Sequence, residues 1–96
     1  MKAPILIIDD KKLTMKEPKA KVWRKLTQLK DKEQDIDTFA EIIATAFSAD
    51  GITADDVLDN VTVSELIPLS FACISYVNEL VDSKLEKIVP KNVAAE

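Results

Sequence analysis

The stretch DIDTFAEIIATAF, residues 35–47, decides the fold of this 96-residue chain. Its apolar residues recur at the three- and four-residue spacing of one helical face: Ile36, Phe39, Ala40, Ile43, Ala46 and Phe47. Asp35 or Asp37 can cap the first turn, and Thr38 with Glu41 offers a capping-box alternative. We therefore predict an amphipathic helix that ends at Gly51, the only glycine, which is suited to the left-handed conformation after a helix.

Helical spacing is also found on both sides of this stretch. From Lys19 onward, Val22, Leu26 and Leu29 share one stripe, which predicts a first helix of about 12 to 15 residues with Trp23 beside the stripe. Residues 31–35 contain no apolar side chain and are predicted to form a loop. Acidic residues follow Thr53, where they favour the start of a short helix.

The last helix is predicted to be unusually long. Thr62 and Glu65 have capping-box spacing, and a main apolar stripe follows, consisting of Ile67, Phe71, Ile74, Val77, Val81, Leu85 and Ile88. Pro68 either kinks this helix or begins it after one isolated turn, and we favour the second interpretation. Pro90 is expected to end the helix and to leave residues 90–96 as a frayed tail.

The N-terminal residues have the pattern of a β-hairpin. Ile5–Ile8 and Leu13–Met15 are short apolar runs separated by the four-residue polar connection Asp9–Lys12. A two-stranded hairpin is marginally stable alone, so either Ile5 and Ile7 or Leu6 and Ile8 must face the helices. The predicted fold class is therefore α+β, mainly α: one domain over 1–96, with a hairpin at 2–17 and a bundle of about four helices at 19–89.

Composition argues against an enzyme. The chain has no histidine and a single cysteine, Cys73, which is expected to be a packed hydrophobe. Residues around Gly51 do not supply the ligands of a calcium loop, and the carboxylates of Asp55, Asp56 and Asp59 are expected to be the solvated turn of a helix. We predict no catalytic residue, no metal site and no cofactor.

Charge is segregated along the chain. Residues 1–34 carry ten Lys or Arg against five Asp or Glu, whereas residues 35–83 carry ten acidic residues and no basic one. The basic first helix is the best argument for binding nucleic acid, although the net charge of −4 opposes it. The two opposite charges favour head-to-tail self-association into a homo-oligomer, either a ring or a filament.

A second set of apolar residues lies beside the main stripe of the last helix, so the helix is apolar over more than half its circumference. This second side is either core, if three helices surround it, or a surface for a partner. The candidate partner-binding residues are Trp23, Arg24, Leu66, Leu69, Tyr76 and Leu80. No apolar run is long enough to span a membrane and no signal peptide is visible, so we expect a soluble, cytoplasmic protein.

The order of these motifs is similar to that of a known family. In this order they resemble the tail assembly chaperones of long-tailed phages and prophages of Gram-positive bacteria. The motifs are a strand with Lys-Leu-Thr-Met at 12–15, Val-Trp-Arg-Lys-Leu at 22–26, a helix ending at Phe47, the turn and helix at 51–58, and Ser-Glu-Leu-Ile-Pro-Leu at 64–69 before an apolar helix. The resemblance covers about residues 5–85.

The resemblance implies a non-enzymatic assembly factor of the host cytoplasm that is absent from the mature virion. Its partners would be the tape-measure protein, which it keeps soluble and extended, and the major tail protein, whose subunits it helps to recruit. The family often adds a longer form by a translational frameshift, and this chain would be the short form. The alternative function is that of a small nucleic-acid-associated regulatory protein that uses the basic first helix.

Overall fold

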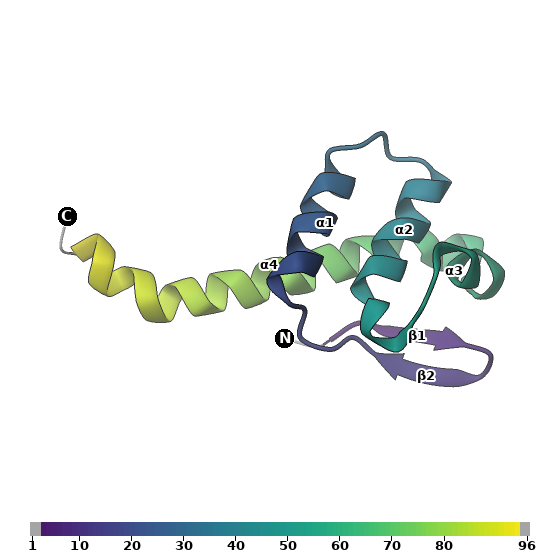
Figure 1. The fold of residues 1–96 in the computed structure, drawn as a ribbon, viewed down its shortest axis with the longest axis horizontal. Coiled ribbons are helices and arrows are strands. Elements are labelled where there is room, and N and C mark those ends of the chain that lie inside the picture. The colour runs from purple at the N-terminus through teal and green to yellow at the C-terminus, as the bar shows by residue number, and fades with distance from the viewer. Residues whose placement is uncertain (1–2, 95–96) are drawn as a thin grey trace.

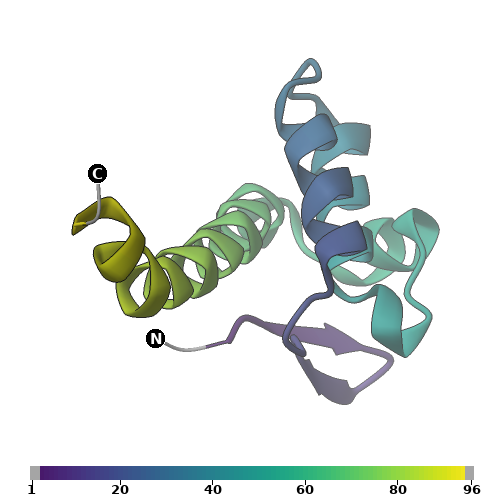
Figure 2. The ribbon, with the colours of Figure 1, turned by 60° about the vertical axis from the view of Figure 1, so that its left-hand side comes forward.

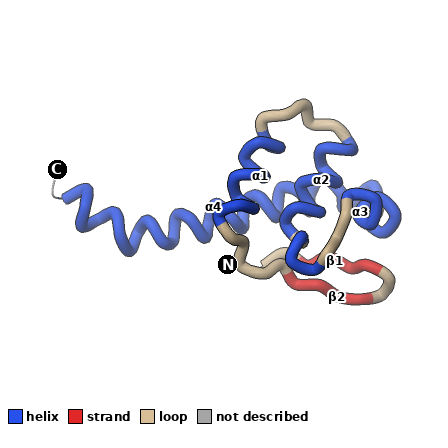
Figure 3. The backbone as a smooth tube through the Cα atoms, viewed as in Figure 1, coloured by secondary structure: helices blue, strands red, loops and turns tan. Residues whose placement is uncertain are grey.

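The computed structural model describes the backbone of residues 3–94 and the side chains of residues 3–82. A two-stranded antiparallel hairpin, β1 (Ile5–Ile8) and β2 (Lys11–Thr14), precedes the helices (Figure 1). The helices are α1 (Ala20–Lys30), α2 (Ile36–Ala46), α3 (Ala54–Asn60) and α4 (Val63–Ala94), with a 3-10 turn, η1 (Ser48–Asp50), between α2 and α3. The predicted α+β class, a hairpin followed by four helices, is confirmed (Figure 3).

Helix α2 is the centre of the bundle. It packs against α1, α3 and α4, and Ala40, Ile42 and Ile43 are fully buried. Asp35 caps the helix as predicted, because its side chain accepts a hydrogen bond of 2.9 Å from the backbone N–H of Thr38. The helix itself ends at Ala46, and Gly51 ends the following 3-10 turn with φ at +74°. The left-handed conformation predicted for Gly51 is therefore confirmed, but it follows η1 rather than α2.

The hairpin covers one end of the bundle with one of its faces. Leu6 and Ile8 are buried while Ile5 and Ile7 are exposed, which settles the choice between the two alternating pairs. The predicted four-residue connection is wrong: Lys11 pairs with Ile8, so that only Asp9 and Asp10 form the turn. Both have positive φ, 49° and 66°, as the two-residue turn that matches the twist of a hairpin requires, and Asp tolerates this conformation better than most residues.

Helix α4 departs most from the expectation. It is continuous from Val63 to Ala94, so Pro68 does not begin it and Pro90 does not end it. Each proline lacks a backbone N–H and therefore removes one hydrogen bond, but the helix continues on both sides of it. The favoured start at Pro68 is therefore wrong, and the helix begins at the capping signal of Thr62, whose carbonyl accepts from the N–H groups of Glu65 and Leu66. Of the predicted tail, residues 95–96 lie outside the described residues.

The length of α4 gives the molecule its shape. The longest dimension is 51 Å and the other two are 28 and 22 Å. Figure 1 shows the first half of α4 behind α1 and α2, and Figures 1 and 2 both show its C-terminal half projecting away from the bundle and the hairpin.

Candidate functional site

One face of α4 forms a buried seam in the core. Leu66, Ser70, Cys73 and Val77 recur every three or four residues, and all four side chains are buried. The hydroxyl of Ser70 donates to the carbonyl of Ile67 at 2.7 Å, which satisfies this polar group inside the seam. Burial raises the pKa of the Cys73 thiol to about 12, so the sulfur is a neutral packing atom at neutral pH, as predicted.

The flank of α4 on one side of this seam is apolar and exposed. Val63, Ile67 and Phe71 follow one another at four-residue spacing, and Ile67 and Phe71 are 44% and 52% exposed. The Phe71 ring packs edge-on against Phe39 of α2, with 6.1 Å between ring centres and an angle of 76° between planes. This contact fixes the ring in place while half of its surface stays in water.

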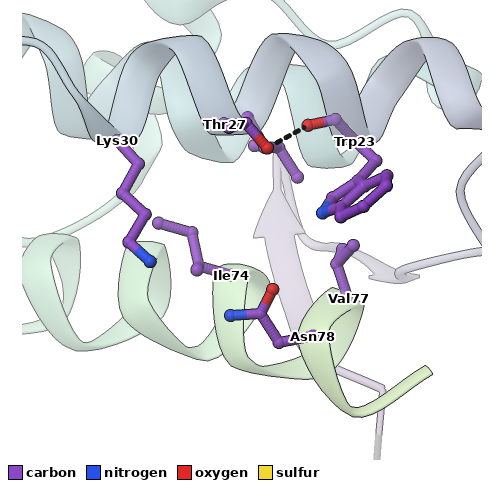
Figure 4. Close-up of a pocket in the computed structure, with 7 residues that line it drawn as sticks. Trp23, Thr27, Lys30, Ile74, Val77 and Asn78 are labelled. Atoms are coloured by element: carbon purple, nitrogen blue, oxygen red, sulfur yellow. Dashed lines mark hydrogen bonds between the residues drawn. The ribbon is translucent and has the colours of Figure 1, made fainter. Parts of the chain in front are cut away.

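A groove separates α4 from α1 on the same side. It has a volume of about 230 Å³ and is lined by Trp23, Leu26, Thr27, Lys30, Ile74, Val77 and Asn78. Figure 4 shows the Trp23 indole and Val77 on facing walls. Trp23 is 44% exposed. The hydroxyl of Thr27, one turn later in α1, donates a hydrogen bond of 2.9 Å to the Trp23 carbonyl.

The opposite flank of α4 carries Leu69, Tyr76 and Leu80, all half-buried. Leu69 and Pro68 line a second groove, of about 310 Å³, together with Ile5 of β1, Ser64 and Glu65. This flank therefore meets the hairpin, whereas the flank of Ile67 and Phe71 meets Phe39.

The sequence-predicted partner residues thus lie in three different places. Trp23 and Arg24 are exposed on α1, Leu66 is buried in the seam, and the other three occupy the hairpin-side flank. The structure brings Trp23 together with Ile74 and Asn78 rather than with Tyr76 or Leu80. Leu66 is only 9% exposed and therefore offers little surface to a partner.

The buried seam of α4 lies between the two apolar sides distinguished in the sequence. Ile67 and Phe71 of the predicted main stripe are exposed, whereas Val77 of that stripe and Leu66 and Cys73 of the second side are buried. The available signal was side-chain size: Ser70 and Cys73 are small, as are Ala40 and Ala44 on α2, and small residues let two helices approach closely.

A third groove lies between α1 and the end of α2 and is basic. Its volume is about 410 Å³, and its lining consists of Lys21, Val22, Arg24, Lys25, Gln28, Thr45 and Ser48. Among the side chains of residues 3–82, the single ion pair joins Lys16 to Asp50 at 2.7 Å, so the three cations of the groove face solvent. No group of three potential metal ligands occurs in the same part of the chain.

The chain as a whole is similar to a known family. A family model described as "phage tail chaperone protein" matches residues 5–92, nearly the whole chain. The chain belongs to the phage tail chaperone family. No curated protein and no solved structure matches it.

Membership confirms the resemblance seen in the sequence and assigns this tail chaperone to a family of assembly proteins rather than to a known family of enzymes. It supports a role in tail assembly through interaction with tail proteins. Within the part of the chain that the structure describes, no helix is long and apolar enough to cross a membrane.

Proposed function

We propose that this tail chaperone binds the tape-measure protein of its phage, keeps it soluble, and helps to recruit tail-tube subunits around it. The proposed action is non-enzymatic, takes place in the host cytoplasm, and leaves the chaperone out of the mature virion. The observation that carries the proposal is the apolar surface that α4 leaves exposed beside its own core seam.

A long amphipathic helix is the kind of partner that this surface fits. Such a helix buries its apolar face in a groove through side chains spaced by three and four residues. The α1–α4 groove offers Trp23 and Ile74 as apolar walls, with Phe71 and Ile67 further along the same flank. Trp23 suits this role because a half-exposed indole supplies much apolar area and loses little side-chain entropy on binding.

Charge keeps the exposed apolar surface soluble. Lys30 lines the groove and is exposed, and the chain as a whole carries a net charge of −4. The nucleic-acid alternative has less support, because the matching family is one of tail chaperones and the net charge of the chain is −4.

Co-expression with the tape-measure protein of the same phage tests the proposal. The unaltered chaperone should hold that protein in the soluble fraction and co-purify with it. The double variant Trp23→Ala, Ile67→Ser should reduce the co-purifying amount by about tenfold or more, equivalent to a loss of about 1.4 kcal/mol of binding free energy. Ile7→Ala, which removes an exposed apolar side chain of the hairpin, is the matched control and should leave the amount unchanged.

Urea unfolding of each variant separates lost binding from lost folding. The proposal is wrong if the tape-measure protein is equally soluble with and without the chaperone. It is also wrong if the folded double variant binds as well as the unaltered protein.

A further inference from the structure

Strand β2 has an edge that faces solvent. Strand β1 packs against α3, whereas the main contact of β2 is with β1, so that β2 is the outer strand of the hairpin (Figure 1). Lys12 and Thr14 of β2 are exposed. The backbone N–H and C=O groups along such an edge can pair with a strand of another chain.

The register of the hairpin fixes the direction of its backbone groups. Ile8 and Lys11 flank the two-residue turn and form the first hydrogen-bonded pair of the ladder. Beyond the other end of the ladder, the N–H of Met15 donates to the carbonyl of Pro4 at 2.9 Å. Between these two points, hydrogen-bonded and non-hydrogen-bonded pairs alternate along an antiparallel ladder.

Lys12 and Thr14 are the residues of β2 that belong to non-hydrogen-bonded pairs. They stand opposite Ile7 and Ile5 of β1. The N–H and C=O groups of Lys12 and Thr14 therefore point away from β1. No other backbone group in residues 3–94 forms a hydrogen bond with them. A strand laid alongside β2 could pair with both residues, because they recur at the two-residue period of a strand.

The side chains of β2 define what such a strand must carry. Lys12 projects on the outer face of the hairpin, and Leu13 projects on the opposite face, where it is half-buried against the core. Side chains that stand directly opposite one another on adjacent strands interact. A carboxylate therefore suits the position beside Lys12, and an apolar side chain suits the position beside Leu13.

The paired segment of β2 is positively charged. Lys11 and Lys12 are exposed and form no ion pair among the side chains of residues 3–82. The acidic residues of the hairpin, Asp9 and Asp10, lie in the turn, outside the paired segment. Lysine on an edge strand opposes pairing with a neutral or basic strand, including the same edge of a second copy. An acidic strand is the partner that the edge still admits.

We propose that β2 receives an extended acidic segment of a partner protein as a third strand, paired antiparallel through the outward backbone groups of Lys12 and Thr14. Strand addition to a sheet edge is a general mode of peptide recognition, and antiparallel pairing is the more stable arrangement. It also supplies the third strand that a two-stranded hairpin lacks. The inference goes beyond the proposed function and does not depend on it.

The register translates the proposal into a pattern of four partner residues. Read from its N-terminus, the segment carries a β-branched polar residue, an apolar residue and two acidic residues. These stand beside Thr14, Leu13, Lys12 and Lys11 in that order. The partner is thus an extended loop or chain end, whereas the groove between α1 and α4 fits a helix.

A synthetic peptide with this pattern tests the proposal. The probe is acetyl-Ser-Thr-Val-Glu-Glu-Ser-amide, and NMR titration of the full chain measures its binding. The peptide should shift the amide signals of β2 more than those of α1. At saturation, the amides of Lys12 and Thr14 should exchange with solvent about fivefold more slowly or less. No binding at millimolar peptide, or shifts confined to the basic groove between α1 and α2, would overturn the proposal.

Methylated peptides distinguish strand pairing from simple attraction between charges. In the proposed register, the amides of Thr and of the first Glu in the peptide face β2, and those of Val and of the second Glu face away. Methylation of the first two amides should weaken binding about twentyfold or more, because two hydrogen bonds are lost. Methylation of the other two should leave binding unchanged. Equal binding by the two methylated peptides, which have the same charge, would contradict the proposal.

Variants of β2 test the two named residues. Thr14→Pro removes an outward N–H that is not part of the ladder with β1, and it should weaken peptide binding about fivefold. Thr14→Ala keeps this N–H and is the matched control, which should bind like the unaltered chain. Lys12→Glu should weaken binding about threefold or more at low salt, through the lost ion pair and new repulsion. Lys32→Glu, an equal change of charge at an exposed position in the loop after α1, should not weaken it.

Urea unfolding establishes which variants are folded. Should Thr14→Pro unfold the hairpin, the methylated peptides and Lys12→Glu still decide the question. Unchanged binding by folded Thr14→Pro, or by Lys12→Glu at low salt, would contradict the proposal. Sedimentation velocity tests for a second copy as the occupant: dimers of the unaltered chain that Thr14→Pro abolishes would overturn it as well.

Discussion

Helices α1 and α2 have the same length, 11 residues, and opposite roles in the fold. Seven residues of α2 are buried, whereas α1 buries only Leu26 and Leu29. Helix α2 begins at an aspartate cap, and α1 begins at Lys19 without a side-chain cap. The stability of the fold thus resides in α2, while α1 presents Trp23 and its cations to solvent on a backbone that α2 holds in place.

The difference follows from composition. Apolar residues on α2 occupy several adjoining faces, so that α1, α3 and α4 can all pack against it. The apolar stripe of α1 is narrow, and lysines occupy much of the remainder. A helix that cannot bury its circumference is free to bind something else.

The largest effect is expected at the end of α2. Phe47 is 1% exposed, and Phe47→Ala should lower the free energy of unfolding by about 3 to 5 kcal/mol, because it removes a ring and leaves a cavity. Urea denaturation followed by circular dichroism measures the change. The control is Ser48→Ala, at the next position, which is exposed. If Phe47→Ala lowers the free energy of unfolding by less than about 1 kcal/mol, the core lies elsewhere.

A smaller effect is expected at α3, which packs on α2. The Thr53 side chain accepts from the Asp56 N–H at 3.2 Å, and Asp56 accepts from the Thr53 N–H at 3.0 Å, so that each residue caps the other. Thr53→Ala should cost about 1 kcal/mol in urea unfolding. The control is Thr27→Ala, which removes an exposed threonine from the middle of α1. If the two variants lower the free energy of unfolding equally, the cap contributes nothing.

The missing cap of α1 can be supplied. Lys19 has the extended backbone of a helix cap, φ −80° and ψ 163°, but its side chain accepts no hydrogen bond. Lys19→Ser should therefore raise the free energy of unfolding by about 0.5 to 1 kcal/mol. Lys19→Ala separates capping from the loss of charge, and it should give no such increase.

The smallest effect is a pH dependence at the existing cap of α2. The backbone and side chain of Thr38 donate to Asp35 and lower the pKa of its carboxyl below the ordinary value of 3.8. The carboxylate therefore stabilises the fold fully above pH 3.8, and this stabilisation is lost as the pH falls through the lowered pKa. The difference in urea midpoint between the unaltered chain and Asp35→Asn should shrink from pH 6 to pH 3. A difference independent of pH would contradict this assignment.

The parts of the fold that local chemistry determines were predictable. Asp35, Thr53 and Gly51 act where their backbone preferences place them, and the spacing of Ile36, Phe39 and Ile43 identified α2. The choice between the two apolar sides of α4 was not local, because it depends on which side α2 approaches. The same limit applies to the candidate site. Trp23 was predicted to lie beside the stripe of α1 and is exposed there, but its neighbours on α4 were not predicted.

Hydrogen exchange of the chaperone, alone and with the tape-measure protein, tests the central claim that α1 and α4 carry the binding surface while α2 carries the fold. The account predicts new protection in α1 and in α4, and little change in α2, which is already protected in the free protein. Protection confined to the hairpin or α3, or none at all in a complex shown to have formed, would contradict the account.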